Sequence, residues 1–137
     1  MVREGGPMRP TTPSEAVIAY LNAYNSHDPE QLAPLYHEDF EVTNPIWNTS
    51  KNREETVAYI SHVWDTLPAS RFEVTNVAVS GDTALLEFIF AWDDPRDGTT
   101  KRAPVADVFT VKDGLLYQLR AYMDATTFHD WIEGMGG

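Results

Sequence analysis

The sequence predicts an α+β fold, in which a curved antiparallel sheet carries helices packed on one of its faces. In the first half of the chain, apolar residues recur at helical spacing in three segments, with a short strand between the second and the third. The second half contains four long strand-like segments separated by turn residues. Helices followed by a run of consecutive strands are typical of an α+β domain.

The first two helices are predicted from their start signals. Ser14 is a candidate N-cap of the first helix, which continues to about Asn25. Asp28 followed by Pro29 marks the start of the second helix, because aspartate is a favoured cap and proline fits the first helical position. This short helix is expected to include Tyr36.

A short strand and a third helix follow. The strand is expected over residues 40–45 and is stopped by Pro45. Asn52 and Glu55 have the spacing of a capping box, which opens the third helix. Pro68 ends this helix, because proline cannot continue the helical hydrogen bonds.

The remaining strands form a meander. They are expected over residues 71–80, 83–92, 104–111 and 115–124. Gly81 and Asp82 form the first turn, and a polar loop over residues 93–102 forms the second connection. Asp113 and Gly114 form the last turn, because an Asp-Gly pair is a strong two-residue hairpin signal.

Length and composition restrict the possible functions. With 137 residues the chain has the length of one domain, expected over residues 14–133 with flexible tails at 1–13 and 134–137. The formal net charge of −11 argues against nucleic acid or an anionic membrane as a partner, since phosphate groups bind basic patches. The absence of cysteine excludes disulfides and fits a cytoplasmic location. No apolar run approaches the ~18–20 residues of a membrane span.

Asp107 stands out in the strand over residues 104–111. It shares one face with Val105, Phe109 and Val111, because successive strand side chains point to opposite sides of the sheet. A carboxylate among apolar side chains is unfavourable unless it is paired or takes up a proton. Asp107 is therefore a candidate neutral acid that donates a hydrogen bond to a substrate oxygen. The structural alternative is a buried aspartate paired with an arginine or with backbone N–H groups.

Three segments of the sequence carry a resemblance to a known superfamily. They are AYLNAYNSHDPEQLAPLYHEDFEVTNP (19–45), PVADVFTVKDG (104–114) and LRAYMD (119–124). They resemble the nuclear transport factor 2-like superfamily, in particular ketosteroid isomerase and the SnoaL-like polyketide cyclases, over about residues 14–128. The resemblance implies a cone-shaped fold, with three N-terminal helices on the concave face of the sheet around a deep apolar pocket. It also implies a homodimer, for which the sheet face bearing Tyr117 and Tyr122 is suited.

The resemblance extends to the active site of the isomerase. Tyr20 and Asp107 fall at the positions of its oxyanion-hole tyrosine and aspartic acid, which implies that both polarise a carbonyl. Asn44 falls at the position of the catalytic base, which is an aspartate in the isomerase. A carboxamide cannot take a proton from carbon, so the standard isomerase mechanism is not expected. As structural alternatives, Tyr20 is an ordinary helix aromatic and Asn44 a turn residue before Pro45.

Apolar residues of the predicted pocket are candidate substrate-binding residues, although most of them also fit an ordinary core. The set consists of Trp47, Trp64, Phe88, Phe90, Trp92, Phe109 and Ala121. A cone-shaped fold that leaves its inner wall partly unfilled would accept a flat or polyunsaturated ligand. Ala121 also falls where the limonene epoxide hydrolase branch has a catalytic aspartate, so that acid is missing here.

Two further residues are candidate acids or bases. Asp124 ends the last strand, but alternation places it on the face opposite to the apolar one, which favours a structural role. His62 lies one position from the apolar stripe of the third helix and is a candidate replacement base, with a solvated histidine as the favoured alternative. The 4 histidines show no metal-ligand spacing, so no metal is expected.

These observations favour a small-molecule isomerase or cyclase that acts on a hydrophobic carbonyl compound, of polyketide or steroid type, without a cofactor. Tyr20 and Asp107 would stabilise negative charge on the carbonyl oxygen, and Asn44 would hold the substrate without deprotonating it. Two alternatives stay open. One is a non-catalytic protein that binds an apolar ligand. The other is an epoxide-opening cyclase that uses another acid or base, with His62 and Asp124 as candidates.

Overall fold

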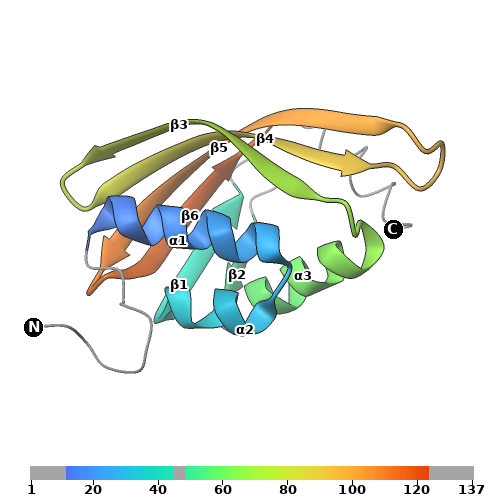
Figure 1. Ribbon diagram of the computed structural model, residues 1–137. Helices are drawn as coiled ribbons and strands as arrows, with labels where there is room; N and C mark the ends of the chain where they lie inside the picture. Colours follow the sequence, from blue (N-terminus) through green and yellow to red (C-terminus); the bar gives the residue numbers. More distant parts are fainter. Residues whose placement is uncertain (1–11, 45–48, 124–137) are drawn as a thin grey trace, which may run out of the picture.

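The α+β prediction is confirmed by the computed structural model, which describes residues 12–44 and 49–123. The helices are α1 (Pro13–Ser26), α2 (Pro29–Leu32) and α3 (Arg53–Thr66), with the short 3₁₀ helix η1 (Ala33–Leu35) after α2. The strands are β1 (Tyr36–Asn44), β2 (Thr49–Asn52), β3 (Arg71–Ser80), β4 (Thr83–Asp93), β5 (Thr100–Lys112) and β6 (Leu115–Tyr122). Figure 1 shows the helices together on the concave side of a curled sheet. No helix in this part of the chain is long and apolar enough to cross a membrane.

The first helix begins earlier than predicted. Thr12, not Ser14, is its N-cap: Thr12 Oγ1 accepts a hydrogen bond from the Glu15 N–H over 3.2 Å, and Glu15 Oε1 accepts one from the Thr12 N–H over 3.1 Å. Ser14 lacks such a partner because Val17 stands three positions after it. The predicted tails at 1–13 and 134–137 lie outside the described residues, except that positions 12 and 13 belong to this helix start.

The second helix starts as predicted but is shorter than expected. Asp28 Oδ1 accepts a hydrogen bond from the Glu30 N–H over 2.9 Å, which caps α2. The α-helix then passes into η1, where Pro34 has no N–H with which to continue the α-helical bonds. Tyr36, expected in this helix, is instead the first residue of β1, which therefore begins before the predicted residue 40.

The third helix and the last hairpin are confirmed by their local geometry. Asn52 Oδ1 accepts from the Glu55 N–H and Glu55 Oε1 accepts from the Asn52 N–H, each over 2.9 Å. This capping box opens α3, which ends at Thr66 ahead of Pro68. Asp113 and Gly114 have positive φ angles of 56° and 75°, as a type I′ turn between β5 and β6 requires.

The sheet has the strand order β2-β1-β6-β5-β4-β3, so that β2 and β3 are its edges. Neighbouring strands run antiparallel except β1 and β6, which pair in parallel. This parallel pair differs from the expected antiparallel arrangement, and it is compatible with the long segment that separates the two strands in sequence. Strand β2 was not predicted, because its sequence TSKN has no apolar alternation.

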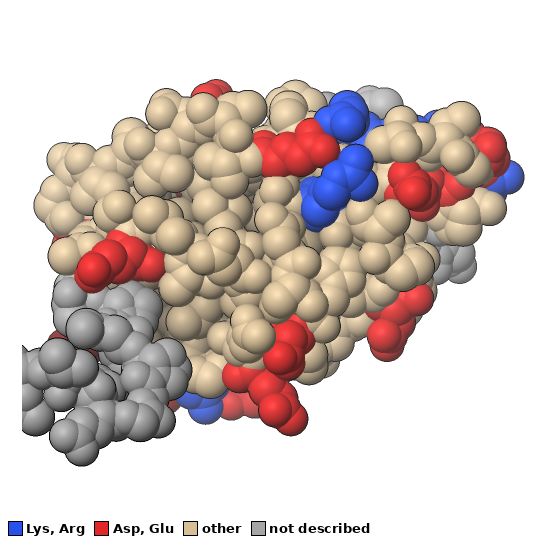
Figure 2. Space-filling model, in the orientation of Figure 1, with Lys and Arg blue, Asp and Glu red and all other residues tan. Residues whose placement is uncertain are grey.

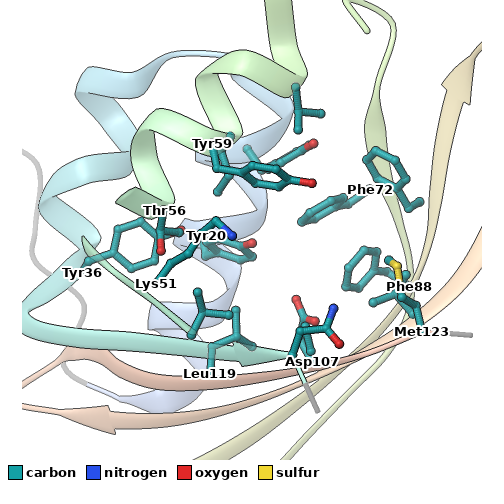
Figure 3. Close-up of a pocket in the computed structure, with 18 of the residues that line it drawn as sticks. Tyr20, Tyr36, Lys51, Thr56, Tyr59, Phe72, Phe88, Asp107, Leu119 and Met123 are labelled. Atoms are coloured by element: carbon teal, nitrogen blue, oxygen red, sulfur yellow. The ribbon is translucent and has the colours of Figure 1, made fainter. Parts of the chain in front are cut away.

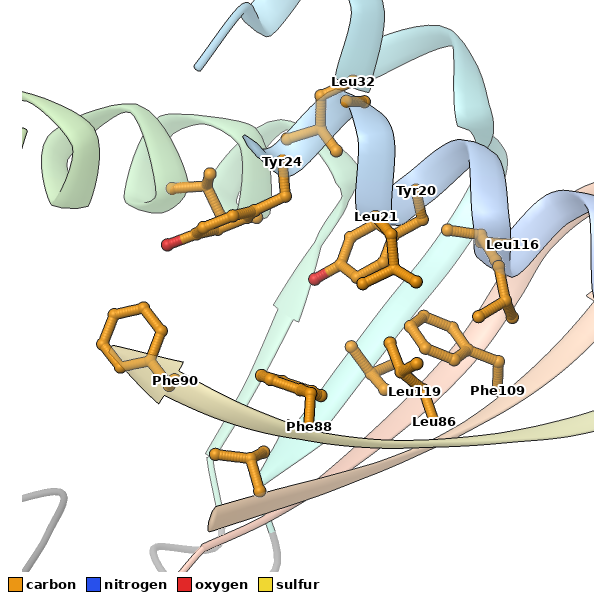
Figure 4. Packing of buried hydrophobic residues seen from close by; sticks show 14 of the residues in the cluster. Tyr20, Leu21, Tyr24, Leu32, Leu86, Phe88, Phe90, Phe109, Leu116 and Leu119 are labelled. Carbon is orange, nitrogen blue, oxygen red and sulfur yellow. The ribbon is translucent and has the colours of Figure 1, made fainter. Parts of the chain in front are cut away.

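The inner face of the sheet follows the predicted alternation. Buried side chains on β4 include Leu86, Phe88, Phe90 and Trp92. Those on β5 include Val105, Asp107, Phe109 and Val111. Figure 4 shows Tyr20 and Tyr24 of α1 directed toward this face, above Phe88 and Phe90. The helices and the sheet therefore share one hydrophobic core, with a carboxyl group inside it.

Candidate functional site

A cavity of about 450 Å³ lies between the inner face of the sheet and helices α1 and α3 (Figure 3). This volume is in the range of sites that enclose a small organic ligand. Most of the wall is aliphatic or aromatic. Apart from tyrosine hydroxyls, the polar side chains that line it within the described residues are those of Asn44, Ser50, Lys51, Thr56 and Asp107.

Asp107 lies in the cavity wall among apolar neighbours. Its cross-strand partners are Leu86 on β4 and Ala121 on β6, and its residue exposure is 4%. Burial raises the pKa of Asp107 to about 8, so the carboxyl carries a proton at neutral pH. No ion pair in the described part of the chain involves this carboxyl. The alternative of a buried aspartate paired with an arginine therefore does not apply.

Tyr20 supplies a second protonated group from α1. Its ring packs edge-on against Phe109, with 5.2 Å between the ring centroids, which fixes its direction. Burial, followed by the neighbouring Tyr36 and Asp107, raises the pKa of Tyr20 well above its ordinary value. The phenol therefore stays a hydrogen-bond donor. Figure 3 shows Tyr20 and Asp107 both directed into the cavity.

Tyr36, the first residue of β1, adds another hydroxyl to the cavity wall. Burial and then the neighbouring Asp107 raise the pKa of Tyr36, while its interaction with Tyr20 lowers it. By distance and angle, its hydroxyl has no hydrogen-bond partner among the residues that the structure describes. A buried hydroxyl of this kind beside Tyr20 leaves a donor for a bound ligand or a water molecule.

Aromatic rings form one side of the cavity. Phe72 of β3 stacks on Tyr24 with 3.8 Å between the centroids and an interplanar angle of 12°. The ring of Phe72 also lies 4.1 Å from that of Phe88, and Phe90 continues the wall. Such a surface of stacked and tilted rings suits a flat, unsaturated ligand.

The residues predicted to bind substrate fall into three groups. Phe88, Phe90 and Ala121 line the cavity, as do the predicted site residues Tyr20, Asn44 and Asp107. Trp64, Trp92 and Phe109 are buried but lie outside the cavity lining, where they pack behind Tyr24, Phe90 and Tyr20, respectively. Trp47 lies outside the described residues, as does Asp124, the candidate acid or base. A direct role in substrate binding stays a prediction for every residue of the predicted set.

His62 does not contribute to the site. It is exposed on α3 and is absent from the cavity lining, so it fits the solvated alternative. Residues 12–44 and 49–123 contain no cluster of His, Cys, Asp or Glu suited to a metal ion.

Several cavity residues were missed by the sequence interpretation. Tyr59 stands with Thr56, Ile60 and Val63 at helical spacing on α3, so this stripe was a usable signal. Lys51 had no such signal, because its strand was not recognised.

Comparisons with known proteins agree with this architecture. Residues 17–119 match the SnoaL-like domain family. The crystal structure of TerC, co-crystallised with polyporic acid, is 22% identical with a TM-score of 0.76, over 88% of this chain and 98% of that one. IdmH from Streptomyces antibioticus, for which a polyketide cyclase function has been proposed, is 18% identical with a TM-score of 0.77, over 88% and 98% of the two chains.

A protein from Jannaschia sp. CCS1, proposed to be a SnoaL-like polyketide cyclase, is 18% identical with a TM-score of 0.74, over 96% of this chain and 97% of that one. At these identities the structural likeness shows the shared fold. No curated protein matches the sequence.

Proposed function

Because the chain belongs to the SnoaL-like domain family, we propose that it is a cofactor-independent isomerase or cyclase that acts on a hydrophobic carbonyl compound of polyketide or steroid type. The observation that carries the proposal is the buried Asp107 carboxyl, which faces an apolar cavity together with the Tyr20 phenol. The similar structures proposed to be polyketide cyclases support a polyketide-like substrate.

The proposed mechanism stabilises negative charge on the substrate carbonyl oxygen. Tyr20 and the protonated Asp107 would each donate a hydrogen bond to this oxygen, and both bonds would strengthen as it becomes enolate-like. The cavity wall is mostly apolar, and a surrounding of low polarity increases the strength of such interactions. Removal of one donor from an oxyanion hole typically raises the barrier by ~2.7–4 kcal/mol.

Asn44 restricts the chemistry that this site would perform. It lines the cavity from the end of β1 but its carboxamide cannot remove a proton from carbon. The reaction would therefore depend on carbonyl polarisation and on the folded conformation of the bound chain, as in a ring closure promoted by proximity and orientation. Asn44 would orient the substrate through its amide.

The direct test removes the phenol donor and replaces the carboxyl O–H donor by the weaker N–H donor of an amide, with little change in the shape of the cavity. Tyr20→Phe should lower turnover of a cyclisation precursor by about 10²–10³-fold and Asp107→Asn by a smaller factor, while circular dichroism stays that of the parent. Tyr117→Phe is a matched control, because Tyr117 does not line the cavity. If both cavity variants turn over substrate at the parental rate, the proposal is wrong. Tight binding without product across a broad ketone panel would instead favour the non-catalytic alternative.

A complementary prediction restores the missing base. Asn44→Asp places a carboxylate where the resemblance to ketosteroid isomerase implies one, so we expect a gain of Δ5-to-Δ4 steroid isomerisation. The appearance of the conjugated enone absorbance measures it. The gained activity should fall in the double variant Asn44→Asp with Tyr20→Phe, and a gain that Tyr20→Phe does not affect would contradict the proposed donor role.

A further inference from the structure

Lys51 brings a positive charge to a cavity whose other described lining residues include no Lys or Arg. It lies directly opposite Val42 in the β1–β2 pair, and directly opposite residues of an antiparallel pair point to the same face. Val42 lines the cavity, so the strand register also directs Lys51 inward. Figure 3 shows the Lys51 side chain reaching from β2 toward the cavity, near Tyr59.

The Lys51 ammonium lacks the carboxylate partner that five of the eight described Lys and Arg residues have. The chain contains 21 acidic residues, yet none of those that the structure describes forms an ion pair with Lys51. Its Nζ instead lies over the Tyr59 ring, 4.9 Å from the ring centroid. This contact leaves ammonium hydrogens available to an incoming anion.

Lys51 and Asp107 act as separate polar groups of the same cavity. Burial alone accounts for the raised pKa of Asp107, and no nearby cation opposes it. Asp107 is 4% exposed, whereas Lys51 is half-buried, so the cation lies closer to solvent than the carboxyl group. One bound molecule would thus meet neutral donors at one position and a cation at another.

We infer that the cavity binds an apolar carbonyl compound that also carries an anionic oxygen group, a carboxylate or an ionised enol, and that Lys51 binds this group. The inference deepens the proposed function and rests on it, since the carbonyl is assigned to Tyr20 and Asp107. On a chain with a net charge of −11, an anionic ligand is repelled at long range, so a local cation determines where it binds. Lys51 is accordingly a specificity-determining residue.

The test compares a keto acid with its own ester. Isothermal titration calorimetry would measure binding of 4-(biphenyl-4-yl)-4-oxobutanoate and of its methyl ester to the parent and to Lys51→Met, Lys51→Arg and Lys112→Met. Lys112 is a matched control, because its Nζ also lies 4.9 Å from a tyrosine ring, that of Tyr117, but it does not line the cavity. Lys51→Met should weaken binding of the acid by about 10–100-fold and leave binding of the ester unchanged.

Lys51→Arg and Lys112→Met should both retain parental affinity for the acid. The inference is overturned if the parent does not bind the acid, if it binds the ester as tightly, or if Lys51→Met weakens both ligands equally. Failure of the proposed function has a different signature: Tyr20→Phe and Asp107→Asn would leave turnover unchanged, whatever Lys51→Met does to the acid.

Discussion

Asp107 is unfavourable for folding and favourable for the proposed chemistry. Its two cross-strand neighbours, Leu86 and Ala121, offer no hydrogen bond from their side chains, so the ionised form is strongly disfavoured. An asparagine or a leucine in this position has no group that ionises, so the cost of keeping an acid buried would be absent. A sequence that keeps the acid accepts a loss of stability, as is common at functional sites.

Asp107→Asn is expected to stabilise the folded protein at neutral and alkaline pH. Folding raises the pKa of this carboxyl from 3.8 to about 8, so the folded state keeps a proton that the unfolded state loses. The free energy of unfolding of the parent therefore falls between about pH 4 and pH 8, by an amount on the order of a few kcal/mol, and stays constant above that range. The amide does not titrate, so its advantage should be small near pH 4 and largest above pH 8.

Urea unfolding of both proteins between about pH 4 and pH 9 measures this difference. Asp97→Asn is a control of opposite sign, because hydrogen bonds from the backbone N–H and hydroxyl of Thr99 lower the pKa of Asp97 to about 2. Loss of that carboxylate should destabilise the protein above about pH 4. Equal free energies of unfolding for the parent and Asp107→Asn across the whole range would rule out a desolvated, protonated Asp107.

At the residue scale, the sequence was informative where a side chain contradicted its strand face. Alternation over residues 104–111 was enough to place Asp107 inside, because its neighbours on that face are apolar. Tyr36 offered no such contrast, since an aromatic residue fits either the expected helix or the observed strand. Lys51 could not be predicted either, because a lysine in a polar segment is ordinary. Only its pairing with Val42 shows which way its side chain points.

At the element scale, capping signals were more reliable than the ends and partners of strands. The capping box of Asn52 and Glu55 is local, so it specifies the start of α3 without tertiary information. Strand β2 depends on hydrogen bonds to β1, and nothing in its four residues requires them. The parallel pairing of β1 with β6 is likewise a tertiary property.

Asn25 of α1 fixes the edge strand β3. Its Nδ2 donates to the Phe72 carbonyl oxygen over 3.1 Å, and its Oδ1 accepts from the Phe72 N–H over 2.9 Å, so one side chain replaces a neighbouring strand. Asn25→Ala should lower the free energy of unfolding by about 1–2 kcal/mol through loss of these two bonds. It should also accelerate hydrogen exchange of the Phe72 amide, which denaturation and NMR exchange would measure.

Ser26→Ala is the matched control for this substitution. Ser26 is adjacent in sequence but bonds to Ala23 and Gln31, not to the sheet. It should leave exchange at Phe72 unchanged. Phe72 also stacks on Tyr24 and lines the cavity, so a change in the position of β3 would also alter the aromatic wall of the cavity. If the Phe72 amide of Asn25→Ala exchanges at the parental rate, the two hydrogen bonds from Asn25 do not hold β3 in place.

At the scale of the whole molecule, the net charge is negative, but the acidic side chains are unevenly distributed over the surface. Figure 2 shows acidic side chains at separate points of one face, with wide uncharged areas between them. The outer face of the sheet is also rich in apolar groups, because the register turns Leu85, Ile89 and Val108 away from the inner face that carries Leu86 and Asp107. Tyr122, predicted on a dimer face, is 41% exposed next to Ala106 on this surface.

We expect two copies of the chain to associate through this outer face. Each copy carries a net charge of −11, so association should strengthen when salt screens the repulsion, as burial of apolar surface is the main attraction. Sedimentation velocity should show a dimer for the parent. Leu85→Glu should yield a folded monomer, because it places an unpaired charge in the contact between its cross-strand neighbours Ala78 and Val108.

Ile18→Glu is the control for the dimer. Ile18 is 48% exposed, but it lies on α1, on the other side of the sheet from the proposed contact. Its substitution adds the same charge and should leave the dimer intact, which separates a local effect from general repulsion. A parent that sediments as a monomer at both low and high salt, or a Leu85→Glu variant that stays dimeric, would exclude the outer face as the interface.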